Sequence, residues 1–326
     1  MPSFIVSSNA NAAASPGECL PSELILRIFE LAAKFSTSCC LTLCLVSIWS
    51  RCFVTPFLVS TVILKRDVGR IHRFKQLLCH SPHFTGRALS RHVHSLWLSP
   101  EAGLHTPSVI LPKLDHLVNI ALSYECMLSW SRISATFRDG NSSDATRRGR
   151  RITLTTTCPA DSITNANAEL TPEHLAVFET VTHLQLKDHR SLDLRRFVSL
   201  THLAIPWPRR KHHSRFDTNI LSVFHEPLDR SLCPYLEFYT ILIDWSGFDA
   251  PAFSWVENMR KIDSRVHLVY HEPRRLQADW EEEVDGGESV WQRAERQTRQ
   301  WEETSRICSS PWVIASVKQR TGSNFM

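Results

Sequence analysis

LPSELILRIFELAAKFSTSCCLTLCLVSIWSRCF, residues 20–53, has the densest apolar spacing in the chain and the clearest helix signals. Pro21 suits the first helical position, where its missing N–H removes no hydrogen bond, and Glu23 falls in the first turn, where the helix dipole favours a negative charge. Apolar residues then recur three and four positions apart, as on one face of an amphipathic helix. They are Leu24, Ile25, Ile28, Phe29, Leu31 and Ala32, and Arg27, Glu30 and Lys34 lie largely on the other side.

The second half of this stretch is apolar on nearly all sides. We predict one helix over Cys39–Phe53, ended by Pro56, and then a short strand over Ser60–Leu64, which is rich in β-branched residues. A module of about 45 residues is too small to cover such a helix by itself. We therefore expect another protein surface to cover its remaining face.

The order of these residues resembles the F-box. The family's succession of Leu-Pro, Glu, Ile-Phe, Leu-x-x-Val and Trp is followed by Leu20-Pro21, Glu23-Leu24, Ile28-Phe29, Leu45-Val46-Ser47, Trp49 and Arg51. The closing strand is similar to that of short, fungal-type F-box proteins. The resemblance covers residues 19–64.

The resemblance implies a non-catalytic substrate-recognition subunit of an SCF-type (Skp–cullin–F-box) E3 ubiquitin ligase. A Skp-type adaptor, and through it a cullin, would bind the helices, and an unknown target protein would bind the rest of the chain for ubiquitin-dependent degradation. Two alternatives stay open: a protein-interaction scaffold that never meets an adaptor, and ordinary helices of a globular core. The implied adaptor contacts are Leu20, Pro21, Leu24, Ile25, Ile28, Phe29, Leu45, Val46 and Trp49.

Cysteine content and the N-terminal residues bear on the compartment. The ten cysteines include no paired C-x-x-C, and Met1–Glu18 lacks the basic start and long apolar run of a cleavable signal. We therefore expect reduced thiols, a disordered leader over residues 1–18, and a cytoplasmic or nuclear location. Residues 39–64 are long enough to cross a bilayer, but Arg51 and Pro56 argue against a span, so no membrane partner is expected.

From residue 93 onward an apolar triplet recurs, with two spacers and then one spacer between its members. Short strands with room for a helix between them favour a parallel sheet with right-handed crossovers. Because the copies are irregularly spaced, residues 65–275 are predicted to form an irregular α/β solenoid similar to degenerate leucine-rich repeats. The copies are Val93-Leu96-Leu98, Leu117-Ile120-Leu122, Val181-Leu184-Leu186, Leu200-Leu203-Ile205 and Leu236-Tyr239-Ile241, while Ile152-Leu154 and Val266-Leu268 match the last two positions.

The expected fold class is therefore α/β, with an N-terminal helical module followed by a solenoid of mostly parallel strands. Helices between the strands are predicted after Thr171-Pro172-Glu173 and after Asp217, and a short basic helix is predicted around Ile71 and Phe74.

The C-terminal region, residues 276–326, is first acidic and then highly charged. Trp291, Ala294, Thr298 and Trp301 lie at helical spacing within it. We predict a helix that caps the open end of the solenoid, with an external partner as the alternative.

Motifs of catalysis are absent from the sequence. It contains no P-loop, no G-x-G-x-x-G, no G-x-S-x-G and no H-E-x-x-H pattern. Cys79, His80 and His83 have a spacing that suits a metal, but no second half follows. We therefore expect a protein that is not an enzyme and needs no cofactor or metal.

Clustered arginines in two polar loops favour a second kind of ligand. With an aromatic side chain among them, such loops can bind an acidic peptide, a phosphate or RNA by charge and stacking. A charge run without a recognition motif is more often solvated surface, so no nucleic-acid partner is expected. The residues concerned are Arg147, Arg148, Arg150 and Arg151 in one loop, and Trp207, Arg209, Arg210 and Lys211 in the other.

Overall fold

The computed structural model describes residues 20–65, 67–80, 89–103, 105–114, 116–123, 125–130, 151–157, 177–187, 193–208, 223–244 and 250–308. The chain forms two compact units, Met1–Leu58 and Val59–Met326, which we call the helical unit and the sheet unit. The predicted leader, residues 1–18, lies outside the described residues.

The helical unit contains α1 (Ser22–Phe35), α2 (Thr37–Val46) and most of α3 (Ile48–Val59). Serines begin the second and third of these helices. The Cys39 N–H donates to Ser36 Oγ at 3.0 Å, which caps α2. Ser47 and Ser50 cap α3 reciprocally, because the backbone N–H of each donates to the hydroxyl of the other at 3.0 Å.

The prediction of one helix ended by Pro56 is wrong. The helix is interrupted at Ser47, which separates α2 from α3, and Pro56 lies inside α3. Ser47 has an extended backbone, which its capping role requires. Pro56 lies in the last turn of α3, where it removes one helical hydrogen bond without ending the helix, which continues to Val59.

The helical unit has a small core. Ala33, Cys40 and Val54 are buried, one from each helix. The Cys40 thiol also donates to the carbonyl oxygen of Val54 at 3.7 Å, which joins α2 to α3. Partly buried neighbours complete this cluster: Leu43, Cys44, Phe53, Phe57 and Leu58.

The sheet unit is built on an eight-stranded sheet among the described residues, with every neighbouring pair parallel and the strands in chain order. This confirms the α/β class and the parallel strands predicted from the triplets. Ser60–Leu64 was predicted as the end of the helical module, but its strand is the first of the sheet. The strands are β1 (Thr61–Leu64), β2 (Ser95–Leu98), β3 (Asn119–Leu122), β4 (Ile152–Thr156), β5 (Val181–Gln185), β6 (His202–Pro206), β7 (Phe238–Asp244) and β8 (Val266–His271).

Strand register follows the triplet. The middle apolar residue of each complete copy lies in one row of paired positions, and each is fully buried. On β4 this position is taken by Leu154, which had been predicted as the last residue of its copy, so that assignment is wrong by one position of the triplet. A continuous column of buried side chains therefore runs through the sheet unit. Its members are Leu96, Ile120, Leu154, Leu184, Leu203 and Tyr239.

This column belongs to the larger core, on the first face of the sheet. The helices α4 (Val68–His80), α5 (His105–Ile110) and α9 (Ala250–Ile262) contribute to it. Ile71 and Phe74 of α4 are buried, as expected for the apolar face of the predicted basic helix. The helices predicted after residues 171 and 217 lie mostly outside the described residues. Short 3-10 segments connect many of these elements: η1 (Leu89–His92), η2 (Pro100–Ala102), η3 (Leu111–Lys113), η6 (Phe178–Thr180), η7 (Leu194–Arg196), η8 (Glu226–Leu228) and η9 (Pro273–Arg275).

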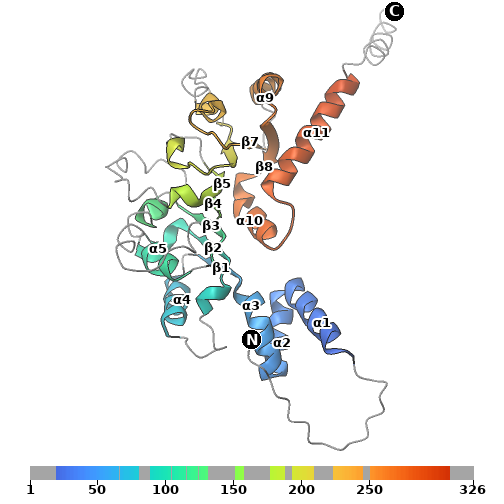
Figure 1. Ribbon diagram of the computed structural model, residues 1–326. Coiled ribbons are helices and arrows are strands. Elements are labelled where there is room, and N and C mark those ends of the chain that lie inside the picture. Colours follow the sequence, from blue (N-terminus) through green and yellow to red (C-terminus); the bar gives the residue numbers. More distant parts are fainter. Residues whose placement is uncertain are drawn as a thin grey trace, which may run out of the picture. The chain divides into compact units, whose positions relative to one another are not determined.

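The second face of the sheet is covered by α10 (Leu276–Val284) and α11 (Val290–Cys308), which lie across the sheet from α4 and α5 (Figure 1). Leu276 and Trp280 of α10 pack against Trp97 and Ala121 on β2 and β3. Farther along the sheet, Val290, Trp291 and Ala294 of α11 pack against Ala204, Leu242 and Val269 on β6, β7 and β8.

Helix α11 also covers the open edge of β8. The Leu268 N–H donates to Thr298 Oγ1 at 3.0 Å, and the Tyr270 N–H donates to Gln297 Oε1 at 2.8 Å. Arg260 of α9 pairs with Glu302 at 2.6 Å, which fixes α11 to a second element. An edge strand with unpaired donors is a template for aggregation, so these side chains protect the end of the sheet.

Candidate functional site

Apolar side chains remain exposed on the helical unit. Leu45 is 81% exposed, and Ile28 and Trp49 are each 51% exposed. Large apolar residues exposed singly are ordinary, but a concentration in one small unit indicates a binding surface. The exposed set is Leu20, Leu24, Ile28, Leu31, Phe35, Leu41, Leu45, Val46, Ile48 and Trp49.

The residues that the F-box resemblance implied lie mainly in this set. Pro21 is exposed as well, whereas Ile25 and Phe29 are half-buried. The motif did not include Leu31, Phe35, Leu41 and Ile48. The three-residue step from Ile28 to Leu31 was a signal for one of them, because it keeps Leu31 near the same helix face.

Trp49 links two of the helices. Its ring lies 5.7 Å from that of Phe29 on α1 and stacks at 6.0 Å on that of Phe53 on α3. The ring is thus held by the helical unit while half of its surface stays exposed. A large aromatic ring, fixed and partly exposed, is a common anchor of protein interfaces.

Polar contacts in the helical unit stabilise the helices. Glu30 accepts hydrogen bonds from Lys34 and Arg27, both at 2.7 Å, and these lower the pKa of its carboxyl. Arg51 Nε donates to the Cys44 carbonyl oxygen at 2.9 Å, near the C-terminal end of α2. The motif arginine therefore joins α3 to α2, and its role is structural in this fold.

The residues predicted to form the two arginine loops fall mainly outside the part of the chain that the structure describes. Arg147, Arg148, Arg150, Arg209, Arg210 and Lys211 lie outside the described residues, and Arg151 is exposed just before β4. Trp207, only 5% exposed, packs against Phe224 and Trp255 at ring distances of 4.8 and 5.8 Å. This corrects the alternative in which Trp207 stacks on a ligand, because its ring is part of the core.

A row of aromatic side chains crosses the second face of the sheet beneath α11. His183 stacks on His202 at 4.1 Å, His202 on Phe238 at 5.5 Å, and Phe238 on His267 at 3.8 Å. Trp291 of α11 meets His183, His202 and Phe238 edge-on. Burial lowers the pKa of His183 to about 4, with smaller effects from His202 and Arg151. Burial also lowers the pKa of His202, and that of His267 to about 3.

These histidines pack the sheet unit in their neutral form. Among the described residues, no group of three or more His, Cys, Asp or Glu side chains is placed to hold a metal ion. His83 and the side chains of Cys79 and His80 lie outside that part of the chain. Nor does any described helix combine the length and apolar character needed to cross a membrane.

Comparison with protein-family models, with curated proteins and with solved structures found no match to this chain.

Proposed function

We propose that the helical unit binds a Skp-type adaptor and that the chain is the non-catalytic substrate-recognition subunit of an SCF-type E3 ubiquitin ligase. The adaptor would connect the chain to a cullin. In this proposal the sheet unit, as a leucine-rich-repeat-like solenoid, binds the target protein. Ubiquitin transfer takes place on other subunits, and this chain supplies proximity and orientation in the cytoplasm or nucleus.

The exposed apolar set of the helical unit is the observation that carries this proposal. Burial of apolar surface stabilises a complex by roughly 25 cal/mol per Å², so a soluble unit gains by covering such residues with a partner. The set includes six of the residues that the F-box order implied, Leu20, Leu24, Ile28, Leu45, Val46 and Trp49, and the implied residue Pro21 is exposed beside them.

A co-expression pull-down with a Skp-type adaptor tests the proposal. The wild-type chain is expected to co-purify with the adaptor, and the double variant Ile28→Asp with Trp49→Ala is expected to bind about 1,000-fold more weakly. Two anchors at an interface centre commonly contribute about 2 kcal/mol or more each. Both side chains are half exposed, so circular dichroism should show that the variant is folded.

Ile262→Asp is the matched control, because Ile262 is an equally apolar, 79% exposed residue of the sheet unit. This control should bind the adaptor as the wild type does. A folded wild-type chain that ignores the adaptor, or a double variant that binds it normally, would contradict the proposal. The first of these results would favour the scaffold alternative.

A further inference from the structure

Helix α11 lies on histidine side chains of the sheet. We use the name histidine row for His183 on β5, His202 on β6 and His267 on β8. Trp291 of α11 packs edge-on against His183 and His202, at ring distances of 5.7 and 5.3 Å. The Phe238 ring stacks on both His202 and His267. The interface between this helix and the sheet is therefore built partly on groups that ordinarily titrate near neutral pH.

The histidine row lies where a positive charge is poorly accommodated. His267 Nδ1 is buried and has no hydrogen-bond partner among the described residues. The Thr201 hydroxyl donates its single hydrogen to the Thr182 carbonyl oxygen at 3.0 Å, so it accepts a hydrogen bond from His202 Nδ1 at 2.9 Å. In the part of the chain that the structure describes, no carboxylate forms an ion pair with a ring of this row. A protonated ring would thus have no counter-ion in contact with it.

Burial is the main reason why the pKa of these rings is lowered, to about 4 for His183 and to about 3 for His267. Positive charges on three other elements add to this effect. Arg151, which precedes β4, acts on His183, while Arg260 of α9 and Arg299 of α11 act on His267. The row is therefore neutral as long as α11 covers it.

Other titratable groups along this interface act in both directions. Burial also lowers the pKa of His202, and the carboxylate of Glu237 opposes that effect. Where α11 begins, burial lowers the pKa of His271 and raises that of Glu283, and these two shifts have opposite effects on the pH dependence of stability. The carboxylates already held by arginines are Glu295 with Arg299 and Glu302 with Arg260.

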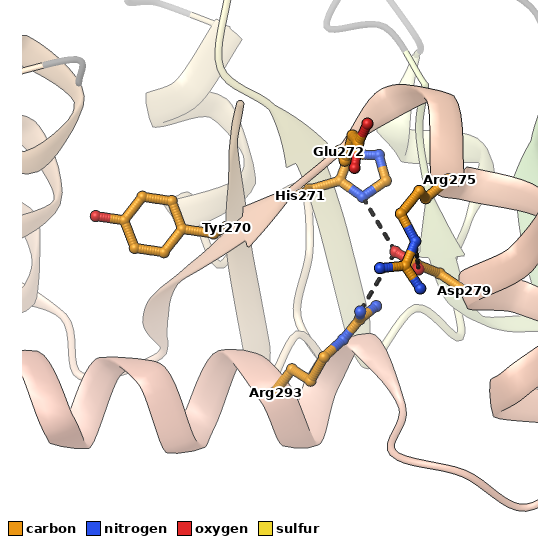
Figure 2. Close-up of a pocket in the computed structure, with 6 residues that line it drawn as sticks. All are labelled: Tyr270, His271, Glu272, Arg275, Asp279 and Arg293. Carbon is orange, nitrogen blue, oxygen red and sulfur yellow. Dashed lines mark ion pairs between the residues drawn. The ribbon is translucent and has the colours of Figure 1, made fainter. Parts of the chain in front are cut away.

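Helix α11 can separate from the sheet while the strands stay paired. Its apolar cluster on β6, β7 and β8 is distinct from the larger core on the first face and from the cluster that holds α10 on β2 and β3. The ladder that holds β8 is formed with β7, not with α11. The polar links of α11 include Thr298 and Gln297 with β8, Glu302 with Arg260, and Arg293 with Asp279 at 3.3 Å, beside the polar pocket drawn in Figure 2.

The connection between α10 and α11 is suited to a hinge. Gly286 and Gly287 lie between the two helices, and Gly286 has a φ of +93°, a conformation that favours glycine. Hinges are loop residues that absorb large changes of φ and ψ, and they are often small. Rotation at this pair would move α11 as a unit and leave α10 on β2 and β3.

We propose that acidification releases α11 from the sheet by protonating the histidine row, while the strands and α10 keep their places. Release exposes the rings to water, where histidine has an ordinary pKa of about 6.5. Above pH 6.5 neither form binds the proton, so these groups have no effect on the equilibrium. Below pH 6.5 the released form binds protons that the closed form excludes, and acid therefore favours release. The proposal does not depend on the adaptor, whose surface lies in the helical unit.

Local release has a direct consequence for the edge of the sheet. The same proton uptake favours local release and complete unfolding, because both expose the rings, but local release breaks only the contacts of α11 and is the more frequent opening. When α11 leaves, the N–H groups of Leu268 and Tyr270 lose their side-chain acceptors. The edge of β8 is then open to pairing with another strand.

Hydrogen–deuterium exchange of the full-length protein at pH 7 and pH 5, followed by mass spectrometry, tests the proposal. After correction for intrinsic exchange rates, the amides of residues 290–304 are expected to lose at least about 100-fold in protection at pH 5. The reason is that His183 and His267 each contribute up to about tenfold per pH unit below 6.5. These amides should also exchange at least about tenfold faster than those of β3 at pH 5, since α11 opens without the strands.

The double variant His183→Gln with His267→Gln should keep most of its α11 protection at pH 5. His94→Gln is the matched control, because His94 is exposed and lies outside the row, and it should behave as the wild type does. Three results would overturn the proposal: α11 protection that does not change with pH, equal protection of α11 and β3 at pH 5, and an undiminished pH effect in the double variant. The first two are read from the wild-type protein, so they decide the question even if the variant does not fold.

Discussion

Replacing Trp291 with alanine is expected to lower the free energy of unfolding of the sheet unit by about 3–5 kcal/mol, the range for a large buried aromatic residue. Trp291 is 8% exposed and lies in the cluster that joins α11 to the second face of the sheet. Its ring also meets His183 and His202 at 5.7 and 5.3 Å. Truncation would therefore leave a cavity between helix and strands. Urea unfolding followed by circular dichroism measures the change.

Trp301→Ala is the matched control for this prediction. Trp301 lies on the same helix, but it is only partly buried. Its truncation should lower the free energy of unfolding by clearly less than that of Trp291, because less apolar surface is lost. If Trp291→Ala changed the stability by under about 1 kcal/mol, the packing of α11 on the sheet would be refuted.

Acidification from pH 7 to pH 5 is expected to lower the free energy of unfolding by about 4 kcal/mol through His183 and His267 alone. Each has a folded pKa below the ordinary value of 6.5, at about 4 for His183 and about 3 for His267. Above pH 6.5 neither state binds the proton, so the two groups have no effect. As the pH falls below 6.5, the unfolded chain binds protons that the folded chain excludes, at about 1.4 kcal/mol per pH unit and group. The loss ends near the folded pKa values, where the native rings are protonated too.

Denaturant unfolding at several pH values between 7.5 and 5 measures this loss. The double variant His183→Gln with His267→Gln should show a much shallower dependence on pH, because glutamine binds no proton in this range. Exposed His94 supplies the control variant, His94→Gln, whose pH dependence should match that of the wild type. An equally steep dependence in the double variant would show that other groups cause the acid sensitivity.

The strands could be predicted because each strand of this parallel sheet must place an apolar residue in the same layer of the core. Leu96, Ile120 and Leu154 occupy equivalent positions, and each must be apolar to fill one layer of the core. The break at Ser47 was harder to predict, since its neighbours on both sides are apolar enough to continue a helix. The interruption at Ser47 depends on its two hydrogen bonds with Ser50. The only sign of these bonds in the sequence is the three-residue spacing of the two serines.

The covering of the second face could not be predicted. Trp291 and Ala294 showed a helical stripe, but a stripe does not say which surface it packs against. The partner residues on the strands include His202 and Ala204, which do not look like a core face in the sequence. His202 and Ala204 become part of a buried face only because Trp291 of α11 packs over them.

The sequence predicted that apolar residues of the helical unit would stay exposed, but it did not predict how they are arranged on the three helices. The apolar excess of residues 20–53 indicated that some side chains would stay exposed, and Leu45 and Trp49 do. The ion pair of Asp279 with Arg293 had no sequence signal, because the two residues are on different helices and meet only when both pack beside β8. The prediction that Trp207 lies on the surface was wrong. Its ring packs against Phe224 and Trp255, which are distant in sequence and gave no local sign of this contact.

The strands follow chain order, and α10 and α11 come after all of them, so the ribosome makes the whole sheet before the helices that cover its second face. A ribosome adds roughly 5–20 residues per second, so β2 leaves it on the order of ten seconds or more before α10. For that interval Trp97 and Ala121 have no helix to cover them, and a growing parallel sheet has an open edge until Thr298 and Gln297 reach β8. The nascent chain therefore exposes apolar strand surface and an open sheet edge until its last helices are made.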